Sequence, residues 1–152
     1  MGCKMMQKEK KTKNDIPDDL FYDSRDYWIK VAQEAAIGLT DYGQSNIGDI
    51  IYLDFVPAGT VVQRGDRCGS IESGKWVGNI LAPVSGVIVE TNSEAEADPH
   101  KVNVDPYGRG WLYRMKPANR SEIGLLMDSG AYKAWSEERT RLAEKHPQGW
   151  SD

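Results

Sequence analysis

The chain has 152 residues, of which 39% are hydrophobic and 28% are charged, and its formal net charge is −4. This length is typical of one domain, and the composition is that of a soluble globular protein with a modest core. The acidic balance, without a basic patch interleaved with aromatic residues, excludes a nucleic-acid-binding role. With no apolar run of membrane-spanning length and no secretory signal, we expect a monomeric, cytoplasmic protein that does not bind membranes.

The two ends of the chain differ in composition from its middle. Five lysines lie between Lys4 and Lys13, and four aspartates follow between Asp15 and Asp23. A segment so rich in charge cannot bury a core. We therefore predict a disordered tail over residues 1–20, a domain over 21–146, and a flexible tail over 147–152.

Beyond residue 20 the sequence predicts short strands separated by turns. A helix over residues 41–46, capped by Thr40 and closed by Gly48, follows a first hairpin. An acidic loop is expected over residues 93–99. The expected strands cover residues 27–31, 35–39, 49–56, 61–62, 68–71, 77–81, 87–91 and 110–115.

The last part of the chain is expected to be helical. Residues 119–122 have the form of a capping box, which predicts one helix, and Gly130 separates it from a second. In the second helix Tyr132, Trp135 and Leu142 recur at offsets of three and seven, so we expect this stripe to pack on the β-structure. On the other face, Glu137 and Arg141 can form an ion pair at i,i+4.

A weak internal repeat relates two segments of the predicted β-structure. Residues 57–62 resemble residues 83–88, with one residue more between the proline and the glycine in the second copy. Two similar halves would form two facing sheets. Many short strands with Gly and Pro turns indicate a sandwich or barrel, so we predict a mainly β fold.

The most informative segment places a lysine in a tight turn between two of these strands. Lys75 follows Ser73 and Gly74, with Ile71 on one side of the turn and Val77 on the other. A lysine at a hairpin tip is held away from the body of the domain and is accessible to another enzyme. This position suits a lysine that is modified and then serves as a tether.

Four blocks of sequence resemble the glycine cleavage system H protein family, in order and without large gaps from about Tyr22 to Trp135. The blocks are Glu72-Ser73-Gly74-Lys75 and residues 38–52, 83–92 and 102–112. The resemblance implies a flattened β-barrel sandwich of the lipoyl-domain type, with a short helix near the N-terminus and two C-terminal helices. It also implies lipoic acid joined by an amide to Lys75, within an attachment hairpin formed by Glu72, Ser73, Gly74 and Trp76.

A protein of this family is a carrier that several enzymes use as a substrate, so no catalytic residues are expected. The two cysteines, Cys3 and Cys68, and the two histidines show no metal-binding or triad spacing. The resemblance implies a lipoate ligase or lipoyl synthase system as one partner. The others would be glycine decarboxylase, aminomethyltransferase and dihydrolipoamide dehydrogenase, or, in sulfur-oxidising relatives, a heterodisulfide-reductase-like complex and sulfurtransferases.

The chain departs from the family near the cleft that shelters the loaded arm. Where the family has His-Glu-Trp, this chain has Asp26-Tyr27-Trp28, so a tyrosine replaces the carboxylate that would pair with a cationic aminomethyl group. On a strand, Asp26 should face away from Tyr27. Gly74 and Trp76 also replace the family's Val and Ala, and we expect Gly74 to loosen the turn.

These departures favour a lipoyl carrier of a sulfur intermediate over the alternative, an aminomethyl carrier of glycine cleavage. A further alternative is an unlipoylated docking module, or a relay that feeds other lipoyl proteins. A biotin carrier fits poorly, because its lysine normally lies between two methionines and Lys75 lies between Gly74 and Trp76.

Overall fold

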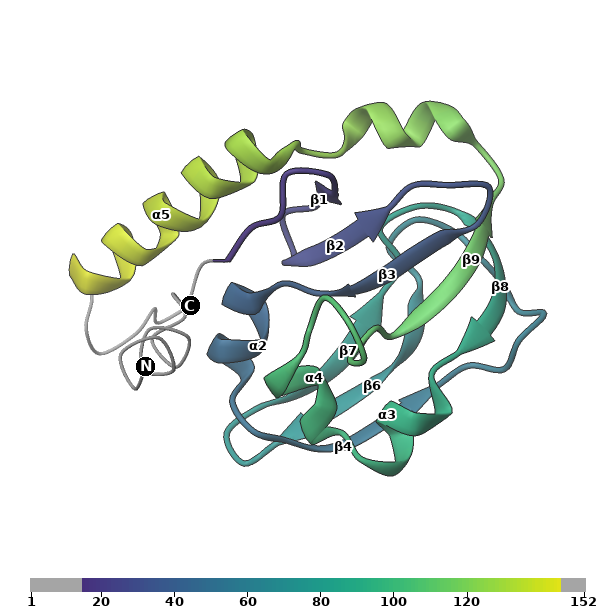
Figure 1. The fold of residues 1–152 in the computed structure, drawn as a ribbon, viewed down its shortest axis with the longest axis horizontal. Coiled ribbons are helices and arrows are strands. Elements are labelled where there is room, and N and C mark those ends of the chain that lie inside the picture. Colours follow the sequence, from purple (N-terminus) through teal and green to yellow (C-terminus); the bar gives the residue numbers. More distant parts are fainter. Residues whose placement is uncertain (1–14, 146–152) are drawn as a thin grey trace, which may run out of the picture.

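The computed structural model describes residues 15–145 and consists of two antiparallel sheets packed face to face (Figure 1). The larger sheet has the order β1-β2-β3-β9-β8-β5, and the smaller has the order β4-β6-β7. The strands are β1 (Phe21–Tyr22), β2 (Tyr27–Lys30), β3 (Ala35–Leu39), β4 (Ile50–Phe55), β5 (Val61–Val62), β6 (Arg67–Ser73), β7 (Val77–Leu81), β8 (Gly86–Thr91) and β9 (Tyr113–Pro117). The mainly β sandwich expected from the sequence is confirmed; among the described residues the two sheets do not close into one barrel.

The core lies between the two sheets and is built from inward-facing aliphatic side chains. Ile29 and Ile37 contribute from the larger sheet and Ile71 and Ile80 from the smaller, each no more than 2% exposed. Full burial of such a side chain contributes about 1.5–3 kcal/mol. The predicted hairpin of β2 and β3 is confirmed, and its register places Ile29 opposite Ile37.

The two copies of the internal repeat lie in the same sheet, which corrects the expectation that they form facing sheets. Strand β5 from the first copy pairs with β8 from the second, with Val61 opposite Val87 and Val62 opposite Gly86. A Cβ at position 86 would overlap the backbone carbonyl of Lys116 on β9. Glycine therefore lets β9 approach β8 closely.

The expected helix forms as α2 (Asp41–Ile47), with the Thr40 hydroxyl accepting the Gly43 N–H at 2.9 Å. The acidic loop expected after β8 is instead two short helices, α3 (Ser93–Ala97) and α4 (His100–Val104). The Asn92 side chain caps α3 by accepting the Ala95 N–H at 3.2 Å. Because Ala95 and Val102 are fully buried, this segment packs on the sheet despite its acidic composition.

The first C-terminal helix is a 3-10 helix, η1 (Arg120–Leu125), and its capping box does not form. The Asn119 side chain accepts the Ser121 N–H at 3.1 Å, as an N-cap should. However, the Glu122 carboxylate turns away and accepts from both the N–H (2.6 Å) and the hydroxyl (3.0 Å) of Ser85. Glu122 thus ties η1 to the turn between β7 and β8.

The second C-terminal helix, α5 (Ser129–Lys145), lies along one end of the sandwich (Figure 1). Of the predicted stripe, only Tyr132 is buried; Trp135 is 38% exposed, and its ring lies beside the Arg139 guanidinium. Arg141 forms its ion pair with Glu138 at i,i+3, so the predicted partner, Glu137, is wrong. The face of α5 that packs against the domain is therefore narrower than the spacing of the three apolar residues predicted.

Part of the predicted N-terminal tail contacts the domain. Leu20 is 8% exposed, and the Tyr22 hydroxyl donates to the Pro17 carbonyl at 2.6 Å. Residues 1–14 and 146–152 lie outside the described part of the chain, so the domain boundaries stay predictions. Within residues 15–145, no helix is long and apolar enough to cross a membrane.

Candidate functional site

The lysine turn joins β6 to β7 and is fastened at its base by Ser73. The Ser73 hydroxyl donates to the Ile47 carbonyl at 2.6 Å and accepts the Lys75 N–H at 3.2 Å, and the Ser73 N–H donates to the Trp76 carbonyl at 2.8 Å. These bonds anchor the turn to the last residue of α2. Lys75 itself is exposed, as expected for a lysine at a hairpin tip.

The stem of Lys75 lies against Gly48, which ends α2. A Cβ built on Gly48 would meet Lys75 Cε at 3.0 Å, and the φ angle of Gly48 is +91°, in the region that favours glycine. The residue that closes the helix therefore also leaves room for the lysine stem. This contact directs the side chain across the end of α2.

The two unusual neighbours of Lys75 differ in their packing. A Cβ on Gly74 would meet no atom within 4 Å, so the space around this position is open. The Trp76 ring lies back over Gly78, where a Cβ would overlap it, and remains 41% exposed. Glu72 is exposed on β6, opposite Val77 across the hairpin and opposite Tyr52 on β4.

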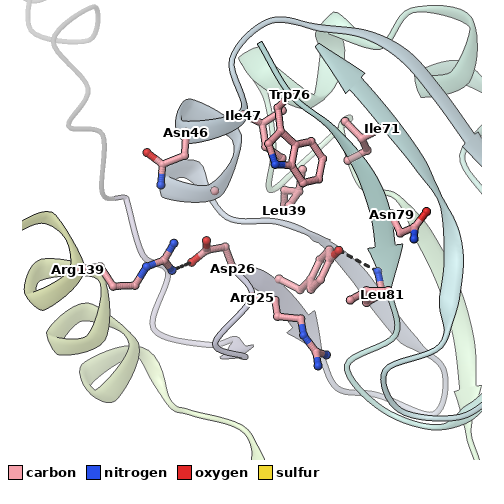
Figure 2. A pocket seen from close by; sticks show the side chains of 12 residues that line it. Arg25, Asp26, Leu39, Asn46, Ile47, Ile71, Trp76, Asn79, Leu81 and Arg139 are labelled. Atoms are coloured by element: carbon pink, nitrogen blue, oxygen red, sulfur yellow. Dashed lines mark hydrogen bonds and ion pairs between the residues drawn. The ribbon is translucent and has the colours of Figure 1, made fainter. Parts of the chain in front are cut away.

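A cavity of about 370 Å³ opens beside this hairpin, between β7, β2 and α2. Figure 2 shows Trp76 at one end of the cavity and Arg25 toward the other. Tyr27 also lines the cavity. Its apolar lining comes from strands of both sheets and from α2: Leu39, Ile47, Ile71, Trp76 and Leu81. The hairpin and the cavity thus form one continuous site.

Tyr27 lies in this cavity, as the sequence predicts, but its oxygen is already engaged. The side chain is 5% exposed, and its hydroxyl accepts the Leu81 N–H at 2.9 Å. Burial raises the pKa of Tyr27 well above its ordinary value, so the phenol is neutral. Tyr27 therefore connects β2 to the outer strand of the smaller sheet and supplies no carboxylate-like acceptor.

Asp26 shares the cavity with Tyr27, which corrects the expectation that the two face opposite sides. Alternation applies within a strand, whereas Asp26 lies in the turn before β2 with a φ angle of +74°. Asp26 is 8% exposed. Its carboxylate accepts hydrogen bonds from Arg139 Nη1 at 2.7 Å and from the Tyr132 hydroxyl at 2.8 Å. Figure 2 shows the ion pair at the α5 side of the cavity.

Two arginines in the cavity lining were missed by sequence reasoning. Arg139 comes from α5, and its guanidinium lies over the rings of Tyr42 (5.1 Å) and Trp135 (5.5 Å). Arg25 comes from the turn before β2. The available signal was the spacing of Trp135 and Arg139, because an aromatic ring on a helix can hold an arginine four residues later.

Other reactive groups lie away from this site. Cys68 is 1% exposed, and burial raises the pKa of its thiol, so it remains a protonated core residue. Among residues 15–145, no three His, Cys, Asp or Glu side chains are grouped as metal ligands would be. The chemistry of the site therefore centres on an exposed amine beside a largely apolar cavity.

Comparison with known proteins gives a consistent result. The family model described as Glycine cleavage H-protein matches residues 20–139. The chain is 40% identical over 120 residues to the glycine cleavage system H protein of Thermus thermophilus, covering 78% of this chain and 94% of that one. It is 41% identical to the one of Bacteroides thetaiotaomicron, covering 78% and 95%. The crystal structure of such a protein from Mycobacterium marinum matches with a TM-score of 0.73 and 34% identity, over 78% of this chain and 97% of that one.

Proposed function

The chain belongs to the glycine cleavage H-protein family, and from this we propose that Lys75 is the residue to which its lipoate is attached. Glycine cleavage H proteins carry a covalently attached lipoate on a lysine and are carriers rather than enzymes, and this chain is a lipoyl carrier of that kind. The single observation that supports Lys75 is its position, exposed at the tip of the β6–β7 turn within the Glu72-Ser73-Gly74-Lys75 block.

The surroundings of Lys75 fit a long acyl chain. From bond lengths, a lysine carrying lipoate extends roughly 14 Å, far enough to lie in the neighbouring cavity or to project from it. The apolar walls at Leu39, Ile47 and Ile71 suit a hydrocarbon chain. When bound, lipoate supplies a reversible dithiol–disulfide pair, and the protein supplies binding and orientation.

Intact mass spectrometry after co-expression with a lipoate ligase, with lipoate supplied, tests this assignment. Lys75→Arg keeps the charge and removes the amine that can be acylated, so this variant should gain no lipoyl mass. Lys133→Arg, at an exposed position on α5, should be modified like the unaltered protein. A lipoyl increment on the Lys75→Arg variant would refute the assignment. If the protein with the natural sequence also gained no lipoyl mass, the result would instead support the unlipoylated docking module.

We infer that the cargo is the aminomethyl group of glycine cleavage, because the relatives named above are glycine cleavage system H proteins. The partners would then be glycine decarboxylase, aminomethyltransferase and dihydrolipoamide dehydrogenase. Glycine-dependent loading of the lipoylated protein by glycine decarboxylase measures this directly. Loading at the rate of a glycine cleavage H protein of known activity would support the inference, and a failure to load would contradict it.

One observation favours a second candidate, the carrier of a sulfur intermediate. The carboxylate that lines the cavity, Asp26, is already bonded to Arg139 and Tyr132, and Tyr27 stands where the family has a glutamate. The sulfur interpretation favoured by the sequence has no support from the relatives named above. In a parallel assay, transfer of sulfur from a sulfurtransferase to the reduced dithiol would support it. The cytoplasmic location and monomeric state stay predictions.

A further inference from the structure

Beside the lysine turn, the smaller sheet exposes a row of side chains, its outer face, formed by Ile51, Tyr52, Glu72 and Val77. Tyr52 on β4 is paired with Glu72 on β6, and Glu72 with Val77 on β7, so their side chains share one face. Val77 is 73% exposed, and Ile51 is exposed at the β-bulge next to Tyr52. Because neighbouring strands lie about 4.8 Å apart, the row spans roughly 10 Å.

The outer face and the cavity lie on opposite sides of the hairpin. Trp76 and Ile71 line the cavity, and a Cβ on Gly78 would meet the Trp76 ring. Glu72 follows Ile71 in the chain, and Val77 lies between Trp76 and Gly78, so both point to the other side. A partner seated on the outer face would therefore leave the cavity open.

Carboxylates surround the apolar residues of the outer face. The Tyr52 hydroxyl donates to Asp54 Oδ2 at 3.3 Å, and the negative charges of Asp54 and Glu96 raise the pKa of Tyr52, so both acids lie near this hydroxyl. The neighbouring cation, Arg67, is already engaged by Asp54 at 3.6 Å. Together with Glu72, the carboxylates named here outnumber this guanidinium. Such a surface favours a partner that presents basic side chains.

We propose that the outer face is the docking surface for the enzyme that attaches lipoate to Lys75, and that this enzyme meets it with an apolar patch rimmed by basic side chains. The proposal rests on lipoylation at Lys75. Exposed apolar residues gathered within a polar rim mark protein interaction sites. Tyrosine is among the residues enriched in such interfaces. Complementary charge across the interface speeds the encounter and disfavours wrong partners.

The reach of the lysine favours the attaching enzyme over the enzymes that later use the arm. From bond lengths, the Lys75 amine lies no more than roughly 6 Å from its own Cα, whereas the lipoylated arm extends roughly 14 Å. The attaching enzyme must therefore approach the hairpin itself, where Val77 lies two residues from Lys75. An enzyme that acts on the end of the arm can dock farther away.

Steady-state lipoylation of the full chain by a purified lipoate ligase, with saturating ATP and lipoate, tests the docking surface. Val77→Lys and Tyr52→Lys each remove apolar area and place a positive charge opposite a basic partner. Each should raise the KM for the carrier about fivefold or more. The kcat should change little, because Lys75 and its turn are unaltered. Val61→Lys is the matched control and should keep the natural KM, because Val61 is 67% exposed but lies on β5 of the larger sheet.

Competition separates docking from the attachment reaction. Lys75→Arg cannot be acylated but keeps the outer face, so it should competitively inhibit lipoylation of the natural sequence. Adding Val77→Lys to this variant should weaken the inhibition about fivefold or more. Adding Val61→Lys instead should leave the inhibition unchanged. Circular dichroism verifies that every variant is folded.

The proposal would be wrong if Val77→Lys and Tyr52→Lys both kept the natural KM, or if Val61→Lys raised it equally. Normal lipoylation of Val77→Lys, followed by impaired loading by glycine decarboxylase, would assign the outer face to the loading enzyme instead. Each of these results requires protein that is modified, so attachment at Lys75 would stand. Lipoylation of the Lys75→Arg variant, or a natural sequence that gains no lipoyl mass, would refute both the attachment site and the docking surface.

Discussion

The half-buried aspartate in the turn before β2, Asp23, allows a quantitative prediction about stability and pH. Burial raises the pKa of Asp23 from 3.8 to about 6, despite the two N–H groups that its carboxylate accepts. Between these two pKa values the native state binds more protons than the unfolded chain, so stability from this group falls as pH rises through this window. One pKa unit corresponds to 1.36 kcal/mol. Above pH 7, the ionised Asp23 carboxylate therefore lowers the free energy of unfolding by about 3 kcal/mol.

Asp23→Asn removes the charge and keeps a side-chain oxygen that can accept the same N–H groups. We expect the variant to be more stable than the natural sequence at pH 7.5, by up to about 3 kcal/mol, and this gain to shrink toward zero at pH 4.5. Urea unfolding followed by tryptophan fluorescence at both pH values measures the difference.

Asp66→Asn is the matched control for this experiment. Asp66 also accepts a backbone N–H, that of Gln63 at 2.8 Å, but lies in an exposed turn. Its substitution should show no comparable gain at pH 7.5. If Asp23→Asn were less stable than the natural sequence at pH 7.5, or if its effect were the same at both pH values, the N–H donors would outweigh burial and the reasoning would be wrong.

Four smaller predictions concern the lysine hairpin and the helix that covers the cavity. Ser73→Ala should lower stability by about 1–3 kcal/mol in urea unfolding and slow lipoylation, because the Ile47 carbonyl loses its donor. Gly74→Ala should stabilise by about 0.4–1 kcal/mol, because the added Cβ meets open space; a loss of stability would contradict this. Glu72→Ala should slow lipoylation while changing stability by less than about 0.5 kcal/mol, and an unchanged rate would identify an ordinary solvated carboxylate. Tyr132→Phe should cost about 1–3 kcal/mol in thermal unfolding, because its hydroxyl is bonded to two buried partners, and a neutral effect would refute that role.

The sequence predicted those parts of the site that depend on local chemistry. The Thr40 cap, the closing Gly48 and the lysine turn each involve residues a few positions apart, and their side-chain and backbone preferences act within one turn. The runs of apolar residues likewise predicted β2, β3 and β7, and most residues of β2 and β3 are buried on both faces of the strand.

The segment after β8 shows where local composition misled the prediction. Its acidic residues favoured a solvated loop, yet it folds as α3 and α4 because Ala95 and Val102 find a place in the core. Asn92 adds bonds to the Arg109 and Trp111 carbonyls, at 2.9 and 2.7 Å, from a segment almost twenty residues away. The burial of Ala95 and Val102 against distant segments therefore outweighed the preference of the acidic residues for a solvated loop.

By itself, the sequence determined that this protein presents a lysine on a β-hairpin, because the turn and its flanking strands form one continuous segment, from Arg67 to Leu81. Only the tertiary structure decided the charge of the cavity beside it. Asp26 and Arg139 are 113 residues apart, and the turn that rotates Asp26 to the same side as Tyr27 is stabilised by its bonds to α5. The sign of a cavity's charge depends on which side chains the packed elements bring together and which of them are already paired, and neither is encoded in local spacing.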